Sequence, residues 1–327
     1  MIPAVDIVIV NWNSGVQLAN CLRSIAQTIS DKYHLASVVV VDNGSSDASL
    51  QGIGDFGLPL KVLANAENRG FAAACNQGAR EGKVDNILFL NPDAELLFDD
   101  SLARSLDFLN TTAAEKIGIV GIQLVDEHGD VARTCARFPV SRDLYGKALG
   151  LDKIWPSRFP GFLLTQWDHA ESRVVDHVIG AFFLVRRELF DQLEGFDEHF
   201  FVYLEDLDFS LRAAHAGWKS YFMSEAKAFH KGGGTSDQIR AKRIYYSLNS
   251  RIIYAFKNYS FAAAASFMLL SLCVEPLIRL CYGIKRNLIL NTCNTLIAYF
   301  HIYKNIPSLF GKIRRMLNVS KRKKCYL

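Results

Sequence analysis

Short β-branched runs alternate with helical patterns over the first 125 residues, and this alternation constrains the fold more than any other feature. The expected order is strand, then helix, ending on a strand, over residues 7–10, 16–28, 37–41, 47–53, 61–63, 71–80, 86–90, 101–109 and 117–124. Such a βαβα order predicts a Rossmann-like α/β fold with a mostly parallel sheet that helices cover on both faces. Farther along, residues 174–186 form a second apolar segment, and residues 217–222 are expected to form a returning strand.

Polar residues follow four of these strands directly. They occupy positions 11–14, 42–46, 65–70 and 91–93. Ligands of open α/β sheets bind beyond the carboxyl ends of the strands, so we expect these loops to form one binding rim. None of them contains G-x-G-x-x-G or G-x-x-x-x-G-K-[ST], which argues against a dinucleotide cofactor and against a P-loop NTPase.

The composition changes after Ser236, where a long helical pattern begins. We therefore expect an α/β domain over residues 1–235 and a helical extension over residues 236–327. The chain is half hydrophobic, enough for a large buried core. Its seven cysteines form no C-x-x-C pair, and those in apolar runs, such as Cys273 and Cys281, are expected to be buried thiols rather than disulfides or zinc ligands.

The extension combines an apolar run with a basic tail. Residues 261–274 are apolar apart from Ser266 and Ser271, and residues 312–327 contain no acid. The basic residues of this tail are Lys312, Arg314, Arg315, Lys321, Arg322, Lys323 and Lys324. This pattern favours a membrane surface over nucleic acid as partner.

The apolar run is shorter than the roughly 20 residues that cross a bilayer, so we interpret residues 261–283 as interfacial or re-entrant. One alternative is a true membrane span, and another is a C-terminal helix packed on the catalytic domain or against another subunit. No basic leader precedes the first strand, so we expect the catalytic part to be cytoplasmic.

Three carboxylates, Glu205, Asp206 and Asp208, interrupt an aromatic and aliphatic stretch over residues 196–212. Burial raises the pKa of a carboxylate and makes it a better base, which favours a role in proton abstraction. The alternative is structural: acids are favoured in the first turn of a helix, and Arg212 could pair with Asp208 at i,i+4.

Three further positions carry a functional and a structural interpretation. Asp93 follows the most hydrophobic early strand. A carboxylate at a strand end can hold Mg²⁺ or Mn²⁺ together with substrate phosphates. The structural alternative is that Asn91-Pro92-Asp93 forms an Asx or proline turn that closes the strand. Asp42 could accept a hydrogen bond from a nucleotide base, or it could simply close a turn. A lone His230 is more often structural than a metal ligand.

Together, these motifs resemble the inverting glycosyltransferases of family 2, with the GT-A fold, and especially the bacterial rhamnosyltransferase-type members. The matching segments occur in family order within residues 5–255, at 9–15, 40–47, 68–72, 90–94, 195–212 and 230–233. Any one of them would be poor evidence, but so many ordered matches make chance unlikely.

The resemblance implies a role for each candidate residue. Asp42 would bind the nucleotide base, and the donor pocket would be lined by Asn11, Asn68, Arg69 and Asn91. Asn91-Pro92-Asp93 takes the place of the family's D-x-D, so only Asp93 is a charged ligand, with His230 completing the metal shell for Mg²⁺ or Mn²⁺. Asp206 would be the catalytic base, supported by Glu205 and Asp208.

The resemblance also implies an activity. We expect an inverting transferase that moves rhamnose from dTDP-rhamnose to a polyprenyl-diphosphate-linked intermediate of a surface polysaccharide such as O-antigen. The alternative is a UDP-linked hexose, N-acetylhexosamine or galactofuranose as donor. The expected location is the cytoplasmic face of the bacterial inner membrane, with no nucleic-acid partner.

Other classes are less consistent with the sequence. A non-catalytic glycan-binding protein of the same fold would lose the base or a metal ligand, whereas Asp93, Asp206 and His230 are all present. A sugar-phosphate nucleotidyltransferase would carry a glycine-rich, basic loop in place of residues 11–15. A processive synthase would have several spanning helices and a Q-x-x-R-W-type motif.

Overall fold

The structure, a computed structural model, describes residues 2–97, 100–232, 239–285 and 289–325, and the side chains of 284–285 and 319–325 lie outside the description. The chain divides into two compact units. Unit 1 comprises residues 1–138, 163–198 and 205–235, and unit 2 comprises residues 139–162, 199–204 and 236–327. The domain boundary expected near residue 236 falls within 233–238, outside the described residues.

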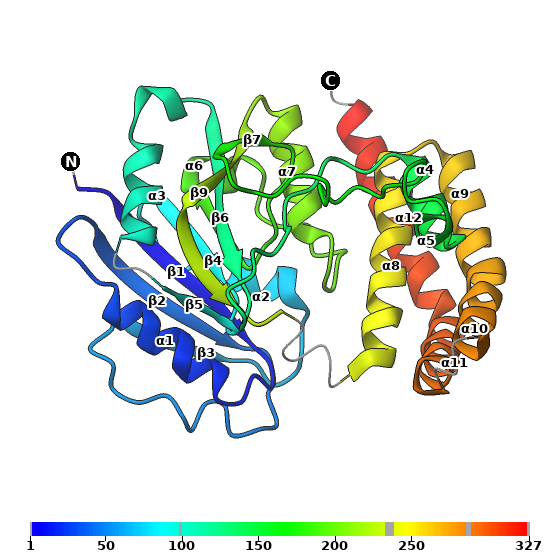
Figure 1. Ribbon diagram of the computed structural model, residues 1–327, viewed down its shortest axis with the longest axis horizontal. Helices are drawn as coiled ribbons and strands as arrows, with labels where there is room; N and C mark the ends of the chain where they lie inside the picture. The colour runs from blue at the N-terminus through cyan, green and yellow to red at the C-terminus, as the bar shows by residue number, and fades with distance from the viewer. Residues whose placement is uncertain (1, 98–99, 233–238, 286–288, 326–327) are drawn as a thin grey trace. The chain divides into compact units, whose positions relative to one another are not determined.

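The first half of the sheet in unit 1 is parallel, as the sequence predicts. Strand β1 lies between β2 and β4, and β3 pairs with β2 at the edge, all in parallel register (Figure 1). The four strands are β1 (Ala4–Asn11), β2 (His34–Asp42), β3 (Leu60–Ala64) and β4 (Asn86–Leu90). Strands β1 and β4 are buried on both faces, which explains their continuous apolar sequences.

Beyond β4 the sheet is mixed rather than parallel. Strand β8 runs antiparallel to both β4 and β6, while β6 and β9 are parallel, and both β5 and β7 pair antiparallel with β9. These strands are β5 (Ala94–Leu96), β6 (Ile117–Val125), β7 (Arg173–Val175), β8 (Phe182–Arg186) and β9 (Lys219–His230). A period of two identifies a strand but carries no information about its direction, so the sequence did not predict this reversal.

Helices cover both faces of the sheet. On one face lie α1 (Gln17–Gln27) and α3 (Ser101–Leu109), and on the other lie α2 (Phe71–Ala79), α6 (Arg187–Gln192) and α7 (Glu205–His215). Leu22 and Leu106 belong to the core of the first face, and Cys75, Phe190 and Phe209 belong to the core of the second. The α/β architecture expected from the sequence is therefore confirmed.

The helix expected over residues 47–53 is wrong, because this segment forms turns. One carboxylate oxygen of Asp47 accepts a hydrogen bond from the Ser49 amide at 3.1 Å, and the other accepts one from the Gly15 amide at 2.9 Å. An Asp side chain that bonds local amides competes with the helix.

Unit 2 consists mainly of helices in its described residues. Helix α8 contacts α9, α11 and α12, helix α10 contacts α11, and α4 contacts both α5 and α9. Their bounds are α4 (Ser141–Ala148), α5 (Leu151–Ile154), α8 (Arg240–Asn258), α9 (Phe261–Leu269), η3 (Leu270–Val274), α10 (Glu275–Lys285), α11 (Ile289–Lys304) and α12 (Ile306–Cys325). Segment η3 is a π-helical turn that joins α9 to α10.

The apolar run of residues 261–274 begins a longer helix, which covers the segment 261–283 interpreted from the sequence. Residues Phe261–Gly283 form 23 helical residues, long and apolar enough to cross a membrane by length and composition alone, a test that a core helix of a soluble protein also passes. Only 39% of its most apolar window is buried within the protein. Cys273 and Cys281 are exposed, so their expected burial is wrong, because this helix turns an apolar face outward.

Candidate functional site

The parallel register of β1 and β2 places Asn11 opposite Asp42 at the carboxyl ends of the two strands. The Asn11 amide nitrogen donates to Asp42 Oδ1 at 2.7 Å and to Ser49 Oγ at 2.9 Å. Asp42 Oδ2 accepts a hydrogen bond from the Ser45 amide at 3.2 Å. Both side chains are buried, and each oxygen of the Asp42 carboxylate accepts one hydrogen bond, so the position of this carboxylate is well defined and acceptor sites remain on it.

Asn43 joins the second and third polar loops. Its side-chain nitrogen donates to Asn68 Oδ1 at 3.0 Å, and its side-chain oxygen accepts a hydrogen bond from the Arg69 amide at 3.0 Å. Gly44 has φ +75°, and a Cβ there would lie 2.8 Å from the backbone of Glu67, so the two loops approach as closely as only glycine permits. Arg69 is held by its backbone, and its side chain is exposed.

Asp93 and His230 lie side by side. Strand β5 pairs with β9 so that Ala94 is opposite His230, and this register brings Asp93 Oδ1 to 3.4 Å from His230 Nε2. Each side chain retains 12% exposure. Among the described residues no group of three or more His, Cys, Asp or Glu side chains is arranged to hold a metal ion, so Asp93 and His230 form a pair of candidate ligands rather than a complete shell.

Asp206 is the second residue of α7, and two backbone amides hold its carboxylate. Its Oδ2 accepts from Gly180 at 2.8 Å, and its Oδ1 accepts from Leu207 at 2.8 Å. His177 Nε2 lies 3.7 Å from Asp206 Oδ2. Burial lowers the pKa of His177, against the opposing effect of the Asp206 and Asp176 charges, so we expect a neutral imidazole at pH 7.

A short backbone segment connects the Asp206 carboxylate to the loop that carries Asp93. The Gly180 amide donates to Asp206, while the carbonyl of the next residue, Ala181, accepts a hydrogen bond from the Asn91 amide at 3.0 Å. The Asn91 carbonyl in turn accepts from Ala94 at 3.1 Å, which closes the turn that carries Asp93. The structure therefore places Asp206, Asn91 and Asp93 along one continuous set of contacts.

The other two carboxylates of α7 have different environments. Glu205 is buried, and its Oε2 has no hydrogen-bond partner among the described residues. Burial, together with the charges of Asp206 and Asp208, raises its pKa well above the ordinary value. Asp208 Oδ2 instead accepts from Arg212 Nε at 2.8 Å, so the i,i+4 partnership weighed in the sequence is present.

The backbone immediately before Glu205 is strained. Tyr203 and Leu204 have φ values of +69° and +66°, in the left-handed region that bulky residues rarely adopt. Such conformations persist where the surrounding structure enforces them, and they concentrate at functional sites. The sequence carries no signal for this strain, because neither residue is Gly or Asn.

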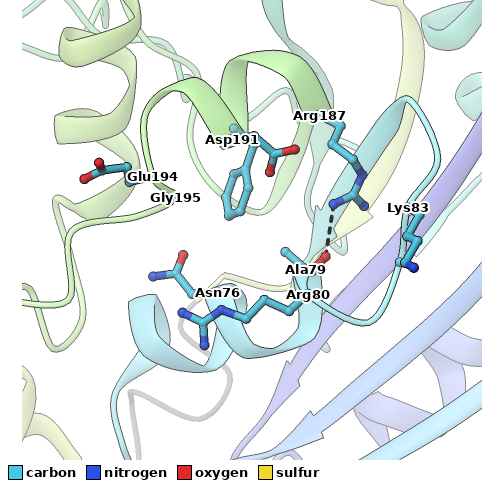
Figure 2. A pocket seen from close by; sticks show the side chains of 10 residues that line it. Asn76, Ala79, Arg80, Lys83, Arg187, Asp191, Glu194 and Gly195 are labelled. Atoms are coloured by element: carbon cyan, nitrogen blue, oxygen red, sulfur yellow. Dashed lines mark hydrogen bonds between the residues drawn. The ribbon is translucent and has the colours of Figure 1, made fainter.

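A cleft of about 600 Å³ lies elsewhere in unit 1 (Figure 2). Its lining residues include Arg80, Lys83 and Arg187, and none of the predicted site residues lines it. Arg187 donates to the Ala79 carbonyl, to the Val84 carbonyl and to Asp6 Oδ2 at 2.9 Å. Asp6 lies near the amino end of β1, and Ala79 is the last residue of the helix that precedes β4, so this cleft is at the edge opposite to the predicted rim.

Two family models match the chain. Residues 6–194 match the model described as glycosyl transferase family 2, and residues 158–303 match glycosyl transferase family group 2. The chain belongs to glycosyl transferase family 2. It is a glycosyltransferase with a GT-A-like fold, as the motifs of the rim and of α7 predicted.

Named relatives are consistent with this family. The N-acetylglucosaminyl-diphospho-decaprenol L-rhamnosyltransferase of Mycobacterium tuberculosis is 27% identical over 275 residues, which cover 80% of this chain and 86% of the relative. The rhamnosyltransferase WbbL of Escherichia coli is 27% identical over 178 residues, 54% of this chain and 63% of the relative. The resemblance to rhamnosyltransferases is thus confirmed at the level of sequence similarity.

A solved structure shows the same fold. The mannosyltransferase PcManGT from Pyrobaculum calidifontis, in complex with GDP-Man and Mn²⁺, is 17% identical and has a TM-score of 0.53. The match covers 97% of this chain and 86% of that one. At this identity the likeness concerns the fold alone.

Three residues of this glycosyltransferase site escaped the sequence interpretation: Asn43, His177 and Gly180. Asn43 was treated as part of a turn, although it holds Asn68 and the Arg69 amide. A Cβ on Gly180 would lie 3.1 Å from Asp206 Oδ2, so this glycine allows the close approach of the two segments. His177 contacts Asp206 from 29 positions away in the chain, and no local pattern reveals such a contact.

We predict that Glu205→Gln stabilises the protein at neutral pH. A raised pKa means that the folded state binds the proton more tightly than the unfolded state, so Glu205 costs stability as the pH rises above its ordinary value of 4.5. Gln removes this cost. Urea unfolding should therefore show a gain for Glu205→Gln at pH 7–8 that disappears near pH 4.

The matched control is Glu115→Gln, which removes an exposed carboxylate and should leave the pH dependence unchanged. If the difference in unfolding free energy between Glu205→Gln and the unmodified protein were the same at pH 4 and pH 8, ionisation of Glu205 would not cost stability and the prediction would be wrong.

Proposed function

We propose that this glycosyltransferase inverts the anomeric centre while moving a sugar from a nucleotide donor to a lipid-linked glycan acceptor. The observation that carries the proposal is the contact between Gly180 and Asp206, which continues through Ala181 to Asn91 and Asp93. This set of contacts supports a mechanism in which the Asp206 carboxylate and the proposed metal ligands Asp93 and His230 act on the same substrate. The strand-end loops at Asp42 and Asn68 then serve the nucleotide.

In this proposal Asp42 accepts a hydrogen bond from the nucleotide base. Asn11 holds the carboxylate in place, and the loop of Asn68 and Arg69 is held beside it by Asn43. The exposed Arg69 side chain supplies positive charge for the donor diphosphate. Asn91 supports the donor site by closing the turn that carries Asp93.

Asp93 and His230 fit a divalent cation in part. A carboxylate oxygen and an imidazole nitrogen 3.4 Å apart could both ligate one ion. Mg²⁺ and Mn²⁺ sites in phosphate-binding enzymes commonly use one or two protein ligands and complete the shell with substrate phosphates and water. The cation, when bound, would offset the negative charge that develops on the leaving diphosphate.

Asp206 acts as the general base. The acceptor hydroxyl oxygen attacks the anomeric carbon, its proton passes to the Asp206 carboxylate, and the bond to the diphosphate breaks with its electron pair on the leaving group. The amides of Gly180 and Leu207 orient the carboxylate, and the neutral His177 excludes water on one side. A positioned base of this kind typically contributes about 10²–10⁴ in rate.

The relatives favour rhamnose and a polyprenyl-diphosphate carrier. The mycobacterial relative's name specifies L-rhamnose transfer to a decaprenol-linked, diphosphate-bearing acceptor, and that relative aligns with 80% of this chain. We therefore propose dTDP-rhamnose as donor and a lipid-linked surface-polysaccharide intermediate as acceptor. The apolar helix of residues Phe261–Gly283 supports an attachment to the membrane, which we place at the cytoplasmic face of a bacterial inner membrane.

A panel of donors tests the activity. With a synthetic prenyl-diphosphate N-acetylglucosamine acceptor, dTDP-rhamnose should give a product with an inverted anomeric centre, while UDP-glucose, UDP-N-acetylglucosamine and UDP-galactofuranose should give far less. Mass spectrometry identifies the product and NMR its anomeric configuration. Preferred transfer from a UDP-sugar would replace the proposed donor, and retention of configuration would refute the proposed inverting mechanism.

Asp206→Asn should lose about 10²–10⁴ in transfer rate while retaining donor binding, because the amide cannot take the acceptor proton. Calorimetric titration with nucleoside diphosphate measures binding, and single-turnover transfer measures chemistry. The matched control is Asp191→Asn, an exposed carboxylate on α6. Near-normal turnover by Asp206→Asn would remove this residue from the role of base.

Exhaustive chelation with EDTA should abolish transfer, and Mg²⁺ or Mn²⁺ should restore it. Asp93→Asn and His230→Gln should each raise the metal concentration that restores half of the activity, because each removes one of two protein ligands. His128→Gln, an exposed histidine, is the control. Full turnover in chelator would reject the metal role of both residues.

A further inference from the structure

A charged cluster lies inside the helical unit and includes none of the candidate site residues described above. Arg251 of α8 donates to Glu275 Oε1 at 2.8 Å, and Arg279 donates to the same oxygen at 2.8 Å through Nε. Arg251 is 4% exposed and Glu275 is 1% exposed. Removing such ions from water is costly unless their interactions repay it, so this cluster requires an explanation.

The cluster is not satisfied by its own members. Among the described residues, Arg251 Nε and Nη1 and Glu275 Oε2 are buried without a hydrogen-bond partner, as are Asp152 Oδ1 and Ser271 Oγ. Buried polar atoms in native proteins are nearly always paired, and exceptions occur where a ligand, an ion or water is normally bound. Five such atoms in one unit therefore indicate a binding site.

The cluster carries more positive than negative charge. Lys147 of α4 lies within electrostatic range of Arg251, Arg279 and Glu275. Although Lys147 keeps exposed surface, crowding of its ammonium by protein atoms and the charge of Arg251 lower its pKa to about 8, with a smaller contribution from Arg279. Lys147, Arg251 and Arg279 thus outnumber the two acidic side chains near Lys147, Glu275 and Asp152, and this net positive charge favours an anionic ligand.

The cluster is also accessible. The Arg279 side chain is 33% exposed, and Lys147 lies on the surface of α4. Arg251 forms the buried layer behind them, where Glu275 fixes its guanidinium. An anion could therefore contact Lys147 and Arg279 from solvent without displacing the helices.

The helix that carries Glu275 is interrupted one turn earlier. Residues Leu270–Val274 form a π-helical turn, and two of its carbonyls accept hydrogen bonds from α11: Ser271 from Tyr299 at 3.0 Å and Leu272 from Tyr303 at 2.6 Å. Single π-turns within α-helices are frequently found at functional sites. Here the turn lies directly between the apolar α9 and the charged start of α10.

An exposed apolar face accompanies the charged cluster. Leu269, Cys273, Leu277 and Cys281 are exposed and recur every four residues, so they share one side of the helix. Helix α11, which contacts α10, also exposes large apolar side chains. They are Ile289, Leu290, Leu296, Ile297 and Phe300.

We propose that Lys147 and Arg279, with Arg251 behind them, bind the phosphate groups of a lipid-linked acceptor whose hydrocarbon chain lies along the exposed apolar face of α9–α11. The proposal rests on the proposed function, since it names the part of the acceptor that this unit recognises. A guanidinium group can donate two parallel hydrogen bonds to a phosphate, and the negative charge of the phosphate would offset the positive surplus of the cluster. The adjacent apolar face matches a prenyl chain.

The test measures direct binding of farnesyl diphosphate to the full-length protein by calorimetry, without any sugar donor. Lys147→Gln and Arg279→Gln should each weaken binding tenfold or more, because each loses a charge-assisted contact. Lys147→Arg should bind within about threefold of the unmodified protein. Arg142→Gln, which removes an exposed cation from the same helix α4, should bind as the unmodified protein does.

Further arms identify the source of the phosphate. Farnesol should not compete with farnesyl diphosphate, because it lacks the phosphates that the cations bind. Inorganic diphosphate should compete weakly, because it offers the phosphates without the hydrocarbon chain. Vesicles of phosphatidylglycerol should bind the Gln variants as well as the unmodified protein. If these variants lose vesicle binding but keep farnesyl diphosphate, the cluster recognises bilayer headgroups and the proposal is wrong.

Unchanged farnesyl diphosphate binding in both Gln variants would also overturn the proposal. If Lys147→Arg bound as poorly as Lys147→Gln and both had lowered melting temperatures, the role of Lys147 would be structural, which rejects it as a ligand. The proposed function fails separately: a protein that binds farnesyl diphosphate through these residues but transfers no sugar would retain this site and lose the assigned activity.

Discussion

The antiparallel insertion of β8 is the constraint on which the candidate site depends. Because β8 starts at Phe182, the two residues before it lie at the rim formed by the carboxyl ends of the parallel strands. Gly180 and Ala181 can therefore hold Asp206 with one amide and Asn91 with one carbonyl. A parallel strand at this position would put its leading residues at the opposite edge of the sheet, and α7 would lose its contact with the rim.

The three carboxylates of α7 show how one short helix can separate roles by environment alone. Asp208 is paired with Arg212 and belongs to the packing of the helix. Glu205 is buried, and its raised pKa means that its ionised form is unfavourable in the folded protein. Asp206 alone combines partial exposure with two orienting amides, which is the environment a proton acceptor needs.

The sequence predicted the strand ends well, because buried strands are apolar and binding loops are polar, so each transition is visible locally. Direction and long-range pairing are not local properties. The reversal of β8, the contact between His177 and Asp206, and the role of Asn43 depend on residues far apart in the chain. The turn at Asp47 was missed for a related reason: its carboxylate bonds the amide of Gly15, on another loop.

The buried ions of the helical unit also bear on how the apolar helix meets a membrane. Glu275 lies roughly 20 Å along the helix from Phe261 at 1.5 Å per residue, so a spanning arrangement would carry its ion pair deep into the hydrocarbon. Its partner Arg251 belongs to α8. The first turn of α8 is basic, so this helix could not enter the hydrocarbon together with Glu275. A helix lying in the interface keeps the ion pair within the protein and turns Leu269 and Leu277 toward lipid. The same arrangement would bring Lys147 and Arg279 to the depth of lipid phosphates, where a lipid-linked acceptor presents its diphosphate.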